Sequence, residues 1–157
     1  MDPLTKPEWR AGVNQVLGSS WTPYTPTLTA TTTSPGGWTC TGAYYRVGAL
    51  VVAQIVAVAG ASATAGSGYY RFSLPVPAAY TLGYDQNVST SMILYDSSSG
   101  SQIYGVGYLA PAVPDLLYIS YQTSLTALGL VGNSTPWTWA AGDVIRGQFM
   151  YDAASAT

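Results

Sequence analysis

The residues of this chain that could do chemistry are mainly carboxylates. Five aspartates lie beside turn signals between apolar segments: Asp85, Asp96, Asp115, Asp143 and Asp152. Glycoside hydrolysis needs two carboxyl groups about 5 to 9 Å apart, and these aspartates could in principle supply such a pair. An aspartate beside a turn more often caps the local backbone through its side chain, and no Asp-x-Asp-x-Asp-Gly spacing supports a calcium loop. The pattern favours structural carboxylates, and we predict that the protein is not an enzyme.

Other catalytic chemistries lack the residues that they need. The chain has no histidine, which excludes imidazole acid–base catalysis, a Ser-His-Asp triad and a histidine metal site. Its single cysteine, Cys40, excludes an internal disulfide and a cysteine zinc cluster, and is most simply a small buried side chain. Gly66-Ser67-Gly68 is not followed by a helix, so a turn is favoured over a phosphate loop. We expect no metal and no cofactor.

The charge balance is unusual and bears on partners. Only 8% of the residues are charged, against about 25% in a typical soluble protein. The basic residues are scattered along the chain: Lys6, Arg10, Arg46, Arg71 and Arg146. They give no positive face for nucleic acid. A surface with so few charges favours non-specific association, and we expect much of it to be covered by further copies of the chain or by a larger assembly.

No segment of the sequence predicts membrane insertion. The most apolar stretch, residues 49–59, includes Gln54 and is shorter than the about 20 residues that a spanning helix needs. The first residues lack the apolar region of a secretory signal. We therefore expect synthesis in a cytoplasm without insertion into a membrane.

Residues 1–20 differ from the remainder of the chain. Thr5-Lys6-Pro7-Glu8 has the form of a helix capping box, with proline in the first turn. Apolar residues follow at helical spacing and include a hydrophobic staple: Leu4, Trp9, Val13, Val16 and Leu17. The pattern predicts a short amphipathic helix or arm of about three turns, which is marginal alone in water. It either packs on its own domain or serves as an anchoring or trimer-nucleating interface.

From residue 21 to residue 157 the sequence predicts one all-β domain. Threonine, valine, tyrosine and serine dominate, and turn residues recur every 8 to 12 positions or so, as in sandwiches and barrels. The predicted strands are 27–33, 38–46, 50–59, 69–74, 89–95, 101–109, 117–121, 127–131 and 144–151. We expect about 8–10 strands in an antiparallel arrangement.

The predicted strand that begins at Leu50 is apolar on both alternating faces apart from Gln54. An antiparallel strand with one wet face would alternate apolar and polar residues. The pattern predicts cover on both sides, by the opposing sheet and by a loop or another subunit. Five aromatic residues could supply that cover: Trp38, Tyr44, Tyr45, Tyr69 and Tyr70.

Four blocks of the sequence carry a family resemblance. They are Trp21-Thr22-Pro23-Tyr24-Thr25-Pro26-Thr27-Leu28, then Gly37-Trp38-Thr39-Cys40-Thr41-Gly42-Ala43-Tyr44-Tyr45-Arg46-Val47-Gly48, then Gly66-Ser67-Gly68-Tyr69-Tyr70-Arg71-Phe72-Ser73-Leu74-Pro75, and late in the chain Pro136-Trp137-Thr138-Trp139-Ala140-Ala141-Gly142-Asp143. In this order they resemble a β domain common in minor tail and minor capsid proteins of tailed phages that infect actinobacteria. The resemblance covers roughly Trp21 to Tyr151.

The resemblance implies a jelly-roll-like antiparallel β-sandwich, usually homotrimeric and displayed on the virion surface. The shared residues look like scaffold signatures: Arg46 and Gly48 at a strand turn, Leu74-Pro75 at a strand end, and Gly142-Asp143 at a tight turn. Tail members carry a long N-terminal shaft or adaptor, whereas 20 residues precede the domain here. We therefore expect a capsid decoration or minor capsid protein that binds the major capsid protein lattice of the head.

The alternative is a receptor-binding or minor tail protein that contacts a host cell-surface glycan. Exposed aromatic residues on loops 80–87 and 96–104 would then bind the sugar. The 20 aromatic residues suit this function and an interface function alike. A cell-wall hydrolase is a third alternative, and it lacks a plausible acid–base pair.

Overall fold

The computed structural model describes residues 21–79, 86–87, 89–110, 112–125 and 127–154. The predicted arm, with Leu4, Trp9, Val13, Val16 and Leu17, lies outside the described residues. So does most of the aromatic loop at 80–87.

The described chain is all-β, as the sequence predicts. The strands are β1 (Thr22–Tyr24), β2 (Leu28–Ala30), β3 (Gly36–Val47), β4 (Leu50–Thr64), β5 (Tyr70–Ser73), β6 (Gln86–Asn87), β7 (Ser89–Tyr95), β8 (Gln102–Leu109), β9 (Leu116–Ser124), β10 (Ala127–Leu130) and β11 (Val144–Asp152). Every predicted strand has an observed counterpart, and β1 and β6 are additional. No helix in the described part of the chain is long and apolar enough to cross a membrane.

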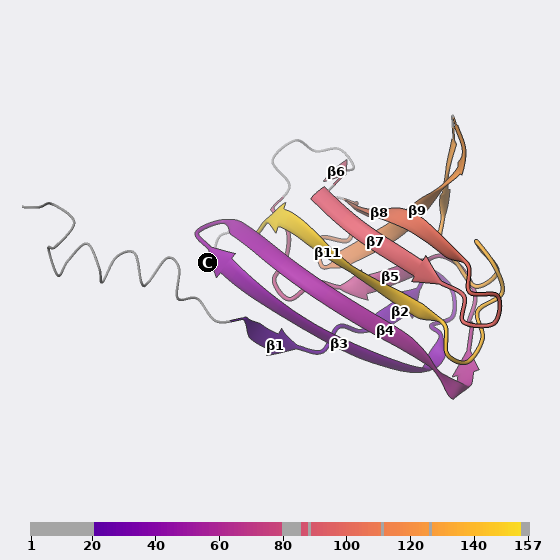
Figure 1. The fold of residues 1–157 in the computed structure, drawn as a ribbon. Helices are drawn as coiled ribbons and strands as arrows, with labels where there is room; N and C mark the ends of the chain where they lie inside the picture. Colours follow the sequence, from indigo (N-terminus) through magenta and orange to yellow (C-terminus); the bar gives the residue numbers. More distant parts are fainter. Residues whose placement is uncertain (1–20, 80–85, 88, 111, 126, 155–157) are drawn as a thin grey trace, which may run out of the picture.

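All strands belong to one antiparallel sheet. Its order is β1-β3-β4-β11-β7-β8-β9-β5-β2, with β10 paired to β9 and β6 paired to β8. The sheet curls, so that β5, β2 and β9 lie behind β3, β4 and β11 (Figure 1). Its two ends approach each other, because Trp38 of β3 contacts Tyr70 of β5 with ring centroids 6.2 Å apart. The concave side of the curl therefore encloses the core.

Alternation along each strand fills this core. In β11, Ile145 and Phe149 are fully buried, while Arg146 and Gln148 between them are exposed. Successive side chains of a strand point to opposite faces, so each long strand contributes one apolar row to the interior. The largest fully buried side chains come from strands all around the curl: Tyr70, Phe72, Phe149, Ile55, Met92, Leu94, Leu109, Leu117, Ile119, Ile145, Val51 and Val131.

The sequence predicts cover on both faces of β4, by the opposing sheet and by a loop or another subunit, and the described residues supply that cover only in part. The inward row is buried, whereas Val56 and Val58 on the outward row remain 39% and 38% exposed. Trp38, Tyr44 and Tyr70 pack with the core rather than over the outward row. Val52 on the same outward row is buried, and it pairs with Tyr45 of β3, whose ring contacts Trp21 with ring centroids 5.0 Å apart. Cover by another subunit stays a prediction.

The residues that carry the family resemblance lie at turns and strand ends, as expected. Gly48 has a φ of +60° in the turn between β3 and β4, a conformation that favours glycine. The Arg46 guanidinium donates to the carbonyls of Gly48 at 2.7 Å and Ala154 at 3.1 Å, which ties this turn to the end of the chain. Leu74-Pro75 follows β5 directly, and Gly142 has a φ of +89° just before β11.

Candidate functional site

The convex side of the sheet carries the strongest candidate site, which we call the outer face. It consists of the outward side chains of β3, β4, β11, β7 and β8, as the strand registers place them: Thr39, Thr41, Ala43, Tyr45, Val47, Leu50, Val52, Gln54, Val56, Val58, Ser91, Ile93, Tyr95, Gln102, Tyr104, Val106, Val144, Arg146, Gln148, Met150 and Asp152. Apolar and small polar groups dominate this surface. Within the set, only Arg146 and Asp152 carry a charge.

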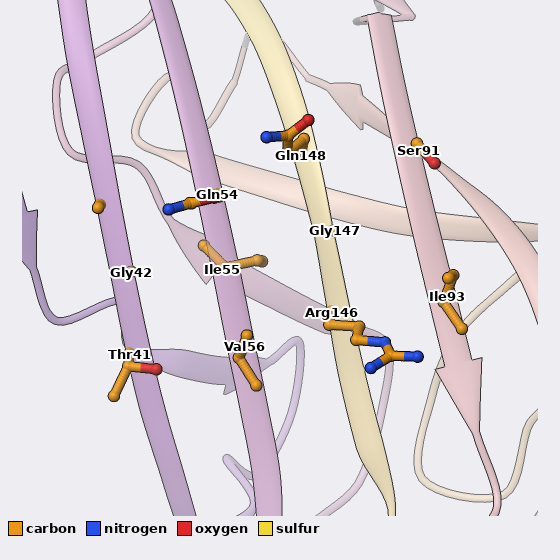
Figure 2. Close-up of a pocket in the computed structure, with 11 residues that line it drawn as sticks. Thr41, Gly42, Gln54, Ile55, Val56, Ser91, Ile93, Arg146, Gly147 and Gln148 are labelled. Atoms are coloured by element: carbon orange, nitrogen blue, oxygen red, sulfur yellow. The ribbon is translucent and has the colours of Figure 1, made fainter. Parts of the chain in front are cut away.

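An open hollow of about 580 Å³ lies at the centre of the outer face. Its polar lining side chains are Thr41, Gln54, Ser91, Arg146 and Gln148. Gln54 pairs with Gln148 across β4 and β11, and Gln148 pairs with Ser91 across β11 and β7. Figure 2 shows the two glutamine side chains side by side, with the Arg146 guanidinium reaching toward Ile93. The hollow is thus a patch of hydrogen-bonding groups around one cation.

Arg146 differs from the other described cations because nothing in the described chain binds it. Arg46 donates to two carbonyls, as above. Arg71 donates to the Ala30 carbonyl at 3.0 Å and lies over the Tyr118 ring, 5.7 Å from its centroid. Arg146 makes no hydrogen bond or ion pair with any described residue. Its guanidinium keeps its full capacity for a carboxylate from elsewhere.

Asp152 lies at the other end of the same outward row of β11. Its side chain is exposed and makes no hydrogen bond or ion pair with a described residue. Six residues separate it from Arg146, which is about 20 Å along a strand. The two opposite charges of the outer face therefore do not neutralise each other within one chain.

Of the aspartates considered as acid–base candidates, Asp143 has a clear structural task. Its buried carboxylate accepts from the Ser97 amide at 2.9 Å, the Ser97 hydroxyl at 3.2 Å and the Ala140 amide at 2.8 Å. It joins the turn after β7 to the turn before β11, as a turn aspartate is expected to do.

Asp96 also binds its own turn. Hydrogen bonds from the Ser98 and Ser99 hydroxyls, with further ones from their amides, hold the pKa of this exposed carboxyl below its ordinary value. Asp85 lies outside the described residues. Among the described residues, no group of three or more His, Cys, Asp or Glu side chains is placed to hold a metal ion.

Cys40 is half-buried in β3 and packs against the core. Burial raises the pKa of its thiol, and a hydrogen bond with the Leu28 backbone opposes that rise in part. Because the thiolate is the reactive form, this environment makes Cys40 a poor nucleophile.

A second exposed apolar feature went unrecognised in the sequence. The β9–β10 hairpin projects from the sheet (Figure 1), and Leu125 at its tip is 96% exposed, with Leu128 at 63%. The signal was present, since Leu125 lies in the short loop between two predicted strands and Leu128 lies just after that loop. Tyr104 is the one aromatic residue of the predicted loop 96–104; the structure places it in β8 rather than in a loop, where it is 73% exposed at the edge of the outer face.

Comparison with protein-family models, with curated proteins and with solved structures finds no match to this chain. The functional conclusion therefore rests on the residues and surfaces described above.

Proposed function

We propose that this protein is a non-enzymatic structural protein of a phage virion surface. In its specific form, the proposal is a capsid decoration or minor capsid protein that binds the head lattice as a homotrimer. The observation that carries it is the outer face, which exposes Leu50, Val56, Val58 and Met150. Beside them lie one cation and one carboxylate that have no partner among the described residues. Several large apolar side chains exposed on one face of a sheet are typical of protein–protein contacts.

The β9–β10 hairpin supports the same function. Leu125 contributes almost no buried apolar surface to the stability of the fold, because nearly all of its side chain faces solvent. A projecting apolar tip suits insertion into a pocket on a different protein, which is a heterologous contact of the kind that builds cyclic trimers and lattices. The major capsid protein is the partner that the family resemblance implies for it.

The fold is compatible with the finer architecture of the proposal. The curl places β5 and β2 behind β3 and β4, with the core between them (Figure 1). Two such layers are the basis of a jelly-roll-like sandwich. The mechanism would be mass action: a protein that binds only the assembled lattice shifts the equilibrium toward it.

The test is the location and occupancy of the protein on purified virions. Immunogold labelling with an antibody to residues 21–157 should place gold over the head. The double change Leu125→Ser and Leu128→Ser should lower occupancy, while the matched change Thr123→Ser on the same hairpin should not. Deletion of residues 1–20, or Trp9→Ala, should also weaken attachment if the arm is an anchor. Gold absent from virions would overturn the proposal.

A second candidate function is glycan binding, which the Arg146 hollow and Tyr104 favour. Amide, hydroxyl and guanidinium donors beside an exposed tyrosine ring match sugar hydroxyls and a pyranose face. Gold confined to the tail tip, together with binding of host cell-surface polysaccharide that Tyr104→Ala abolishes, would favour this function over decoration. A Tyr104→Ala variant that binds as well as the parent would remove it.

A further inference from the structure

We propose that two copies of this chain pack outer face against outer face, about a twofold axis that crosses the middle of β11. Arg146 of each copy then faces Asp152 of the other. The inference goes beyond the proposed function, because it assigns the outer face to a twofold contact between copies and leaves the β9–β10 hairpin for the lattice contact. A trimer that also used it would pair with a second trimer.

The charge order along β11 is the first support. Its outward row runs Val144, Arg146, Gln148, Met150, Asp152, so the two charges lie at equal distances from position 149. Two antiparallel copies of this row, centred at position 149, place each guanidinium opposite a carboxylate. A twofold contact must be self-complementary in this way. Both groups lack a partner among the described residues of their own chain.

The neighbouring strand β4 obeys the same symmetry. Phe149 pairs with Ala53 in the sheet, so the axis crosses β4 at Ala53. Reversal about that point places Val56 opposite Leu50 of the second copy. These two side chains are 39% and 41% exposed in the single chain. The contact therefore covers the exposed apolar side chains on the outward row of β4, which a single chain leaves in solvent.

On β3, the same symmetry places a large side chain opposite a small one. Ala53 pairs with Tyr44, which places the axis at Tyr44 on β3. Reversal then puts the large side chain of Tyr45 opposite Ala43 of the second copy. Facing sheets pack about 10 Å apart with interdigitated side chains, so a bulky residue needs a small one across from it. Thr41 falls opposite Val47, which is also exposed.

The available area suffices for a stable contact. Five strands at about 4.8 Å each give a width of about 24 Å, and the nine residues of β11 at about 3.4 Å each give a length of about 31 Å. Their product, about 700 Å² per copy, is close to the roughly 800 Å² per partner of a standard interface. A partner without a carboxylate opposite Arg146 would bury that charge unpaired, which is strongly unfavourable.

The experiment measures the mass of the purified full-length chain by light scattering and sedimentation over a wide concentration range. The contact predicts an even number of chains, two or six. Arg146→Asp or Asp152→Arg alone places like charges together and should halve that number. The double variant Arg146→Asp with Asp152→Arg restores the pairs in reversed order and should restore the parental mass. Gln122→Asp, a new charge on exposed β9, should leave the mass unchanged.

Two results would overturn the inference. One is a mass of one chain or three chains at every concentration. The other is an even mass that neither single variant changes, or that the double variant fails to recover while circular dichroism shows all variants folded. Neither result bears on where the protein lies on the virion, which immunogold labelling tests separately.

Discussion

The two faces of β11 differ in burial and in charge, although they belong to the same strand. On the inner face Ile145 and Phe149 are fully buried. On the outer face Arg146 and Asp152 are charged, exposed and unpartnered among the described residues. The comparison shows that the inner face is complete within one chain, whereas the outer face has binding capacity that one chain does not use. Substitutions on the two faces should accordingly affect different measurements.

The largest effect is expected from Phe149→Ala on the inner face. Removal of a fully buried phenylalanine leaves a cavity and should lower the free energy of unfolding by about 3–5 kcal/mol. Met150→Ala, one position along on the outer face, should lower it by less than about 1 kcal/mol in the same urea titration. Similar losses for the two variants would mean that the faces do not differ as described.

Asp143→Ala should have the next largest effect. The change leaves the Ser97 and Ala140 amides without their carboxylate acceptor and should cost about 2–3 kcal/mol of unfolding free energy. The matched control is Asp115→Ala, because Asp115 is exposed and its carboxylate makes no hydrogen bond with a described residue, so the effect should stay within about 0.5 kcal/mol. A negligible loss for Asp143→Ala would show that the two turns do not depend on this carboxylate.

The pH dependence of stability should also depend on buried tyrosines of the inner face. Burial raises the pKa of Tyr70 from its ordinary 10.0 to about 12, and its hydroxyl donates to the Ala65 carbonyl at 2.7 Å. The folded state favours the neutral phenol, so this stabilisation is complete below pH 10 and is lost as the pH rises toward 12. Burial also raises the pKa of Tyr24 and Tyr151, which adds to the loss.

Denaturant titrations at pH 9 to 12 check this expectation. Tyr70→Phe should reduce the slope of stability against pH, although Tyr24 and Tyr151 maintain part of it. Tyr104→Phe, which alters an exposed ring on the outer face, should leave the slope unchanged. An unaltered slope in Tyr70→Phe would contradict the assignment to Tyr70.

The smallest effect on stability is expected at the hairpin tip. Leu125 is almost wholly exposed, so Leu125→Ser should change the unfolding free energy by no more than about 0.5 kcal/mol. Its effect belongs to binding, measured as virion occupancy. A loss of stability comparable to that of Phe149→Ala would show that the tip packs on the body of the domain.

Local patterns in the sequence were sufficient to place nine strands. The segment predicted at 144–151, after the turn Ala141-Gly142-Asp143, differs from β11 (Val144–Asp152) by one residue at its end. β1 was missed because Pro23 argues against a strand, although proline is tolerated at a sheet edge. β6 is too short, at two residues, to show a pattern.

The outer face could not be predicted in this way, because it is assembled from strands far apart in the chain. Arg146 lies beside Val56 and Ile93 only because β11 pairs with both β4 and β7. Pairing partners are decided by how the whole set of apolar rows closes over one core, and local sequence carries little of that information. The sequence by itself thus determined the all-β class, the approximate positions of nine strands and the sparse charge. Only the tertiary structure decided which face is covered, which charge is unpaired and where the hollow lies.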